Sequence, residues 1–250
     1  MNILNALYPS LPFRARLRGK PKSFDGGDLD PRGEETFSLI EDVGIKPTDD
    51  VLDIGCASGR MARPLLKFLS QGSYRGFDIV AKGIESANKE IGLYFDHIDA
   101  YNMVYNPLGK VKDDQVTFPY AESKFSFVFA NSIFTHMLPE GVERYLTEIK
   151  RVAKPGLRSY LTFFLLTEES LRRLDQRKAA HRLPHVWDGY RTLRKHIGRE
   201  GVVAYEEKFI SQMIARAGLR VDRIVYGSWS GIQNATMPKL FQDIIVVTKP

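Results

Sequence analysis

The segment Val51–Arg60, which reads VLDIGCASGR, limits the possible folds of this chain more than any other segment. A short apolar run bounded by turn residues is typical of a buried strand, and Asp53 lies inside its end. Gly55 and Gly59 then form a loop whose backbone can approach a ligand closely, because no Cβ intervenes. The stretch RMARPLLKFLS that follows reads as a helix, with Pro64 near its first turn. The segment therefore predicts a strand, a ligand-binding loop and a helix in direct succession.

Strands and helices alternate along the rest of the chain. The candidate strands cover residues 49–55, 73–80, 93–100, 125–132, 158–166, 220–229 and 242–250. Alternation of this kind predicts right-handed βαβ units and a parallel sheet with helices on both faces. The last two strands have no helix of useful length between them, so we expect them to pair antiparallel. The predicted fold class is α/β, a doubly wound, mostly parallel seven-stranded sheet with a C-terminal antiparallel hairpin.

The length and composition favour one domain. A chain of 250 residues with 43% apolar content can bury a single sizeable core. We expect residues 34–250 to form this domain and residues 1–33, which are rich in proline and glycine, to form an N-terminal arm. Two substrate-side inserts interrupt the alternation, at 101–122 and 167–204. Both leave the carboxyl ends of strands, where open α/β sheets bind ligands, so we expect lids or binding walls there.

The net charge of +6 is concentrated in two blocks, Arg14–Lys22 and Arg172–Arg199. Neither block interleaves aromatic and basic residues, which favours a solvated surface or an anion-facing entrance over an RNA-binding track. The longest apolar runs are too short to span a bilayer, and the N-terminus has no signal-peptide pattern. The single cysteine forms neither an internal disulfide nor a zinc cluster. We expect a cytoplasmic protein without a membrane span.

The glycine loop matches neither of two common phosphate-binding patterns. It lacks the third glycine of G-x-G-x-x-G and the Gly-Lys-Ser/Thr end of a P-loop. What remains is Asp53, a G-x-A-x-G loop and a second acid, Asp78, at the end of the next strand. Two carboxylates at neighbouring strand ends suit a ligand with an ammonium group and a ribose diol, as in S-adenosylmethionine. Here the chain resembles the class I S-adenosylmethionine-dependent methyltransferases, with Ala57 in place of the usual middle glycine of their first motif.

The resemblance implies a Rossmann-like fold and a set of cofactor-binding residues. These are Asp53, Gly55, Cys56, Ala57, Gly59 and Arg60 in the first motif, Asp78 and Ile79 after the second strand, Asp99 and Ala100 beside adenine, and Asn131 and Ser132 beside the transferred methyl group. Each acid has a structural alternative: Asp53 as an acceptor of backbone N–H groups, and Asp99 as a turn former. Cys56 is interpreted as a small residue beside the pocket, not a nucleophile.

A hydroxyl acceptor needs a base, and histidine is the natural candidate. His136 follows Asn131 and Ser132 in NSIFTHM, on the loop where substrate and methyl group should meet, so we assign it as the catalytic candidate. His181 and His185 in the second insert are the alternatives, as lid residues. They are not expected to form a metal site, because Pro184 interrupts helical spacing between them. No metal is predicted.

The sequence as a whole predicts methyl transfer from S-adenosylmethionine to a hydroxyl of a small molecule or sugar. The stretches YNPLGKV, FANSIFTHMLPEGVERYLTEIKRV and QDIIVVTKP resemble a bacterial subgroup associated with glycan or secondary-metabolite methylation. Two alternatives stay open. One is an RNA methyltransferase that uses the basic surface, although no appended RNA-binding module is apparent. The other is a non-catalytic S-adenosylmethionine-binding protein. The sequence does not fix the acceptor or the oligomeric state.

Overall fold

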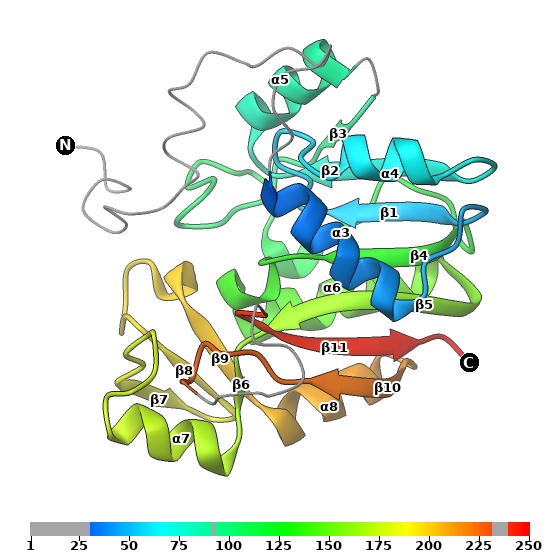
Figure 1. Ribbon diagram of the computed structural model, residues 1–250. Helices are drawn as coiled ribbons and strands as arrows, with labels where there is room; N and C mark the ends of the chain where they lie inside the picture. Colours follow the sequence, from blue (N-terminus) through cyan, green and yellow to red (C-terminus); the bar gives the residue numbers. More distant parts are fainter. Residues whose placement is uncertain (1–30, 92–93, 232–239) are drawn as a thin grey trace.

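The computed structural model describes residues 31–91, 94–231 and 240–250, and its centre is a seven-stranded sheet (Figure 1). The strand order is β10-β11-β5-β4-β1-β2-β3. β3, β2, β1, β4 and β5 run parallel, whereas β11 pairs antiparallel with both β5 and β10. The expected doubly wound sheet and its C-terminal antiparallel hairpin are confirmed. The strands are β1 Asp50–Ile54, β2 Ser73–Asp78, β3 Asp96–His97, β4 Phe125–Ala130, β5 Ala153–Phe163, β10 Arg220–Val225 and β11 Asp243–Thr248.

Helices cover both faces of this sheet, as alternating side chains require. In β1, Val51 packs on one side of the sheet, while Leu52 and Ile54 pack on the other. The first side is covered by α3 (Pro31–Val43), α4 (Ala62–Phe68) and α5 (Ala81–Ile91), and the second by α6 (Pro139–Val152) and α8 (Glu207–Arg216). Most of the sheet is therefore apolar on both faces, whereas the edge strand β10 exposes Arg220, Asp222 and Arg223.

The N-terminal part of the chain differs from the expected boundary. Residues 1–30 of the expected arm, with the basic block Arg14–Lys22, lie outside the described residues, and residues 31–33 form the first turn of α3. The third strand is shorter than expected, with only Asp96 and His97 in the ladder. Its expected first residue, Leu93, also lies outside the described residues.

The second insert is a folded unit and not an irregular loop. Together with its flanking residues, the insert expected at 167–204 comprises β6 (Leu165–Leu166), α7 (Glu168–Asp175), β7 (His185–Trp187), β8 (Tyr190–Thr192), the 3-10 turn Arg199–Gly201 and β9 (Val203–Glu206). Its strands form a separate sheet in the order β6-β9-β8-β7. This sheet lies at the end of the central sheet where β5 finishes (Figure 1). It has a small core of its own, made by Phe164, Leu166, Leu183, Val202, Ala204 and Trp229.

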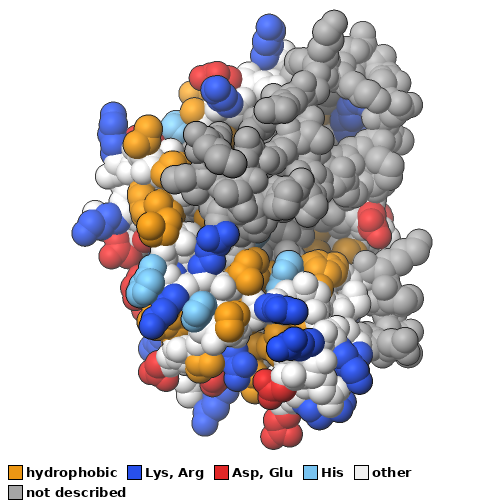
Figure 2. Space-filling model, turned by 90° about the vertical axis from the view of Figure 1, so that its left-hand side faces the viewer, with side chains coloured by type: hydrophobic (Ala, Val, Ile, Leu, Met, Phe, Trp, Pro, Cys, Tyr) orange, Lys and Arg blue, Asp and Glu red, His pale blue; other side chains and the backbone are white. Residues whose placement is uncertain are grey.

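The basic block Arg172–Arg199 lies on the surface of this folded insert. Exposed members include Arg177, Lys178, Arg182, Arg194 and Lys195. Lysine and arginine side chains gather on the lower part of the face seen in Figure 2, interspersed with apolar and histidine side chains. Among residues 31–91, 94–231 and 240–250, we find no helix with the length and apolarity needed to cross a membrane.

Candidate functional site

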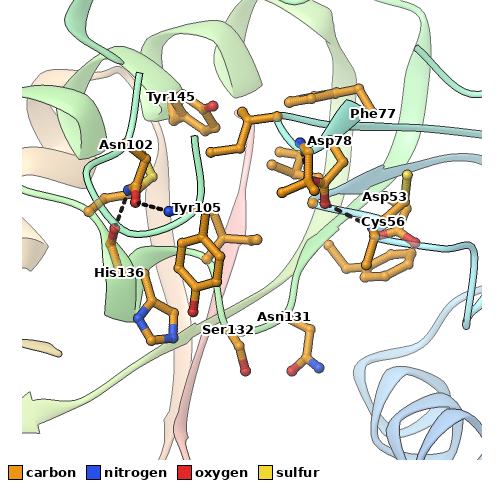
Figure 3. Close-up of a pocket in the computed structure, with 18 of the residues that line it drawn as sticks. Asp53, Cys56, Phe77, Asp78, Asn102, Tyr105, Asn131, Ser132, His136 and Tyr145 are labelled. Carbon is orange, nitrogen blue, oxygen red and sulfur yellow. Dashed lines mark hydrogen bonds between the residues drawn. The ribbon is translucent and has the colours of Figure 1, made fainter. Parts of the chain in front are cut away.

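A cavity of about 650 Å³ lies beyond the carboxyl ends of β1, β2 and β4, where a doubly wound sheet is expected to bind ligands (Figure 3). It is lined by most of the residues that the sequence singled out: Asp53, Gly55, Cys56, Ala57, Arg60, Asp78, Ile79, Ala100, Asn131, Ser132 and His136. Gly59 and Asp99 do not line it. His181 does, whereas His185 lies in β7 away from the cavity.

The loop after β1 is held in a left-handed conformation at three positions. The φ angles are +77° at Gly55, +51° at Ala57 and +77° at Gly59. Glycine suits position 55, because any side chain would be strained at this φ and its Cβ would lie 2.0 Å from Cδ1 of Ile133, which would have to move. Gly59 does not line the cavity, and its missing side chain leaves room for Ile91. Its part in cofactor binding stays a prediction. Ala57 bears the strain that a glycine would avoid.

Asp78 ties this loop to the end of β2. Its carboxylate accepts hydrogen bonds from the backbone N–H groups of Ala57 and Val80, at 2.8 Å each. Burial raises the pKa of Asp78, and these two N–H groups oppose the rise. The N–H of Ile79 also lowers the pKa of Asp78, and the Asp78 side chain lines the cavity.

Asp53 is buried at the end of β1, where the Tyr74 hydroxyl donates to its Oδ2 at 2.7 Å. Burial raises the pKa of Asp53 to about 7, with the nearby charge of Asp78 contributing in the same direction. Cys56 packs beside it, with its Sγ atom 3.1 Å from the place where a Cβ of Gly76 would lie. Burial raises the pKa of the Cys56 thiol, as expected of a packing residue and not of a nucleophile.

His136 lies at the opposite end of the cavity from Asp53, beside Tyr105 (Figure 3). Its Nδ1 atom lies 2.9 Å from the carbonyl oxygen of Gly201 and 3.3 Å from that of Glu200. Because carbonyl oxygens only accept, Nδ1 must carry the proton and Nε2 must hold a free lone pair. Burial lowers the pKa of His136 to about 4, so the ring is neutral at pH 7.

Asn131 and Ser132 lie between the two ends of the cavity (Figure 3). Ser132 has a φ of +60°, held by its N–H donating to the Thr162 hydroxyl at 2.7 Å and by its own hydroxyl donating to Gln242 at 3.1 Å. The backbone after β4 is therefore fixed between the glycine loop and His136. This is the place where the resemblance puts the transferred methyl group.

Asp99, which the resemblance puts beside adenine, is not among the residues that line the cavity. Its carboxylate accepts a hydrogen bond from Asn106 at 3.0 Å, within the 101–122 segment, and does not line the cavity. Acids that follow strands often stabilise turns in this way. Its neighbour Ala100 does line the cavity.

The sequence analysis did not identify several residues that line the cavity. They include Asn102, Tyr105, Asp113, Tyr145, Phe164 and Gln242. The segment 101–122 contains Asn102, Tyr105 and Asp113. From the sequence we expected only that this segment forms a lid or a wall of the binding site. Tyr145 lies on the amphipathic helix α6, where its apolar neighbours make it read as a core residue. Within the described part of the chain, no group of three or more His, Cys, Asp or Glu side chains is placed to hold a metal ion.

Comparison with known proteins also indicates a methyltransferase domain. Residues 51–156 match a family model described as a methyltransferase domain. A sterol 24-C-methyltransferase of Gibberella zeae is 30% identical over 47% of this chain and 28% of its own length. The match spans less than half the length of these curated relatives, 28% of one and 43% of another.

Solved structures extend the likeness over nearly the whole chain. The PH0226 protein from Pyrococcus horikoshii has a TM-score of 0.60 at 14% identity, covering 94% of this chain and 99% of that one. A 1,6-didemethyltoxoflavin-N1-methyltransferase from Burkholderia thailandensis, solved with its substrate and S-adenosylhomocysteine, has a TM-score of 0.51 at 14% identity, covering 90% and 79%. At such identities the likeness shows the fold and not the acceptor.

Proposed function

We propose that this chain, which has the methyltransferase domain and Rossmann-like fold of the class I S-adenosylmethionine-dependent methyltransferases, transfers the methyl group of that cofactor to a hydroxyl of a small molecule or sugar. We choose a hydroxyl acceptor because of the protonation state of the His136 ring. Its Nδ1–H is committed to Gly201, and its Nε2 has no hydrogen-bond partner among the described residues. A neutral imidazole with a free lone pair in the cavity is suited to accept the proton of a hydroxyl group.

The other end of the cavity fits the cofactor. The backbone at Gly55 and Ala57 provides a surface without long side chains, and Asp78 keeps acceptor capacity for the two ribose hydroxyls. Asp53 provides a carboxyl group for the cationic amino-acid part. The cofactor supplies an activated methyl group on a sulfonium, so this chain must chiefly align the acceptor oxygen with it.

A pKa of about 4 does not disqualify His136 as the base. The oxygen of a hydroxyl group becomes strongly acidic as its bond to carbon forms, so a weak base suffices if it receives the proton late. The low pKa also keeps the ring unprotonated across the physiological range. His181 also lines the cavity. His136 is therefore our choice as base, with His181 at the cavity wall.

Two measurements test the proposal. Isothermal calorimetry with S-adenosylhomocysteine should give saturable binding to the folded protein, and absence of heat would reject the cofactor site. Mass spectrometry of reactions with panels of alcohols, sugars, phenols, amines and carboxylic acids should find methylated products among the hydroxyl compounds. Products only among the amines or only in tRNA would reject hydroxyl transfer. Binding without turnover on any panel would favour a non-catalytic binding protein.

A further inference from the structure

The folded insert carries the net positive charge of the chain. Residues 172–199 hold nine Lys and Arg against two Asp, a net charge of +7, so the remaining residues together carry −1. Among the described residues that line the cavity, none is a Lys or Arg of this stretch. The proposed methyl transfer therefore gives these cations no task.

The pairing of β7 with β8 brings cations from two segments to one end of the second sheet. His185, the first residue of β7, pairs with Thr192, the last residue of β8. Arg182 comes shortly before β7, and Arg194 and Lys195 come shortly after β8, so the two segments leave the sheet at the same end. All three side chains are exposed.

These three cations are not neutralised within the protein. In the described part of the insert, ion pairs form only in α7, where Glu169 lies 2.6 Å from Arg172 and 3.7 Å from Arg173. The three exposed cations at the end of the sheet take part in none. Their charge is therefore available to an anionic partner.

Two aliphatic side chains are exposed beside these cations. Ile197 is 67% exposed and follows Lys195 closely in the chain, and Val186 in β7 is 64% exposed. Val186 lies opposite Arg191 in β8, and side chains opposite each other in an antiparallel pair point to the same face. Figure 2 shows basic, apolar and histidine side chains interspersed on the lower part of the molecule. Cations beside exposed aliphatic groups are the combination that binds an anionic bilayer.

This surface adjoins the cavity. Arg182 directly follows His181, which lines the cavity. Phe241 lines it too, although this side chain is 44% exposed, and its ring centroid lies 6.0 Å from that of His181. The cavity wall therefore reaches the protein surface next to the cations.

RNA is the other polyanion to consider, and the side chains of this surface suit it less well. Single-stranded RNA is bound by aromatic side chains on which its bases stack. The exposed neighbours of the cations are aliphatic, and Trp187 in β7 is half-buried, with the guanidinium of Arg199 4.1 Å from its ring centroid. The observations favour a bilayer.

We propose that Arg182, Arg194 and Lys195, together with Val186 and Ile197, dock this protein on the surface of an anionic lipid bilayer. The cations lie against the phosphate headgroups, and the aliphatic side chains enter the boundary between headgroups and acyl chains. The exposed part of the cavity wall then lies next to the bilayer. Docking does not require methyl transfer, so it is tested without cofactor.

Flotation with lipid vesicles measures the docking. The full chain should bind vesicles of phosphatidylcholine with about one-third phosphatidylglycerol about 10-fold or more tightly than vesicles of phosphatidylcholine alone. Raising the salt concentration from about 0.1 to 0.5 M should weaken this binding, because salt screens the cations. Binding to neither kind of vesicle, or equal binding to both, would overturn the proposal.

Variants are needed because the block Arg14–Lys22, outside the described residues, is also basic. The double variant Arg194→Gln, Lys195→Gln should weaken binding to the anionic vesicles by about 25-fold, which is about fivefold for each charge. Its matched control is Lys67→Gln, Arg220→Gln, which removes two exposed cations from α4 and β10. The control should weaken binding by about threefold or less. Equal losses in the two double variants would assign binding to net charge and overturn the role of the insert.

The variant Ile197→Ser separates a bilayer from RNA. It should weaken vesicle binding by about fivefold and leave binding to tRNA unchanged, because only the bilayer takes this side chain out of water. Binding to tRNA without binding to vesicles would make RNA the partner and overturn the proposal. Thermal melting checks that each variant folds, and Arg182→Gln, with an expected loss of about fivefold, replaces a double variant that does not. None of these outcomes depends on S-adenosylhomocysteine, so the proposed function is tested separately.

Discussion

The Nδ1 atom of His136 lies 2.9 Å from the carbonyl oxygen of Gly201, a residue of the folded insert. This contact joins the loop after β4 to the second sheet and determines which ring nitrogen carries the proton. The turn that supplies the carbonyl is itself held in place, since the guanidinium of Arg199 lies 4.1 Å from the centroid of the Trp187 ring. The insert therefore orients His136, the catalytic candidate, and its own His181 also lines the cavity.

Replacement of His136 by alanine should separate catalysis from cofactor binding. Loss of a positioned base should lower the rate of methyl transfer about 100-fold or more. Affinity for S-adenosylhomocysteine should stay within about twofold, since the ring lies at the acceptor end. Rates on the hydroxyl acceptor found in the panels, together with calorimetry, measure the two effects. A loss of less than tenfold in rate would remove His136 from the catalytic residues, and His181→Ala would then be the next variant to measure.

Cofactor affinity should depend on pH through Asp53. Its pKa is raised to about 7 without ligand, so much of it is protonated at pH 6. A cationic ligand favours the ionised form, which means that binding below the raised pKa must release a proton. Affinity for S-adenosylmethionine should therefore fall by up to about tenfold for each pH unit below 7.

The variant Asp53→Asn is the matched control for this dependence. It can still accept the Tyr74 hydroxyl, and it removes the titrating group. Its affinity should be lower than that of wild type at pH 8 and nearly constant between pH 6 and 8. Calorimetry over that range in wild type and variant decides the matter. If affinity changed equally with pH in the two proteins, the titrating group would be another residue and not Asp53.

Exchange of alanine and glycine should change the free energy of unfolding in opposite directions at positions 57 and 55. Both have a positive φ, but only Ala57 has a side chain. Ala57→Gly should raise the free energy of unfolding by about 0.5–1 kcal/mol, which is the relieved strain less the greater flexibility of the unfolded chain. Gly55→Ala should lower it by about 2 kcal/mol or more, since strain and a clash with Ile133 add. Urea unfolding followed by circular dichroism measures both. A destabilised Ala57→Gly would contradict the assigned backbone conformation.

The central fold could be predicted because each of its strands is bounded by a helix or a turn residue that the sequence displays. The antiparallel pairing of β10 and β11 followed from the missing helix between them. The second sheet could not be predicted. Leu165 and Leu166 read as the end of the strand expected at 158–166, and His185–Trp187 is too short to show the alternation that identifies a strand. Its order is fixed by tertiary contacts, among them the stacking of Tyr190 on Tyr205.

The sequence predicts those parts of the candidate site that belong to a recognisable motif. It does not predict the parts whose arrangement depends on contacts between residues far apart in the sequence. The glycine loop and Asp78 have a spacing that identifies them in the sequence. The Asp99 carboxylate is bonded to Asn106, and the tautomer of His136 depends on a carbonyl group of Gly201, 65 residues away. Backbone carbonyl groups leave no trace in a sequence. A residue's role in the site therefore cannot be predicted when a backbone group determines it.

Asp243 should be the side chain whose loss most disturbs the junction between the two sheets. Its Oδ2 atom accepts from the N–H of Leu165 and the indole N–H of Trp229, both at 2.6 Å, and its Oδ1 accepts from the N–H of Gly227 at 2.7 Å. All three partners can only donate, so removal of the carboxylate leaves buried donors unpaired, at about 1–3 kcal/mol each. We expect Asp243→Ala to lower the free energy of unfolding by at least about 3 kcal/mol.

The comparison with Asp243→Asn separates the lost hydrogen bonds from the lost side-chain volume. An amide keeps one acceptor oxygen and places an NH₂ group against a third donor, so this variant should lose about 1–3 kcal/mol despite its nearly unchanged size. Asp222→Asn, at an exposed position of β10, should change stability by less than about 0.5 kcal/mol. Urea unfolding monitored by tryptophan fluorescence reports directly on this junction, since Trp229 is one of two tryptophans in the chain. If Asp243→Asn proved as stable as wild type, the three hydrogen bonds would not be what joins the second sheet to β11.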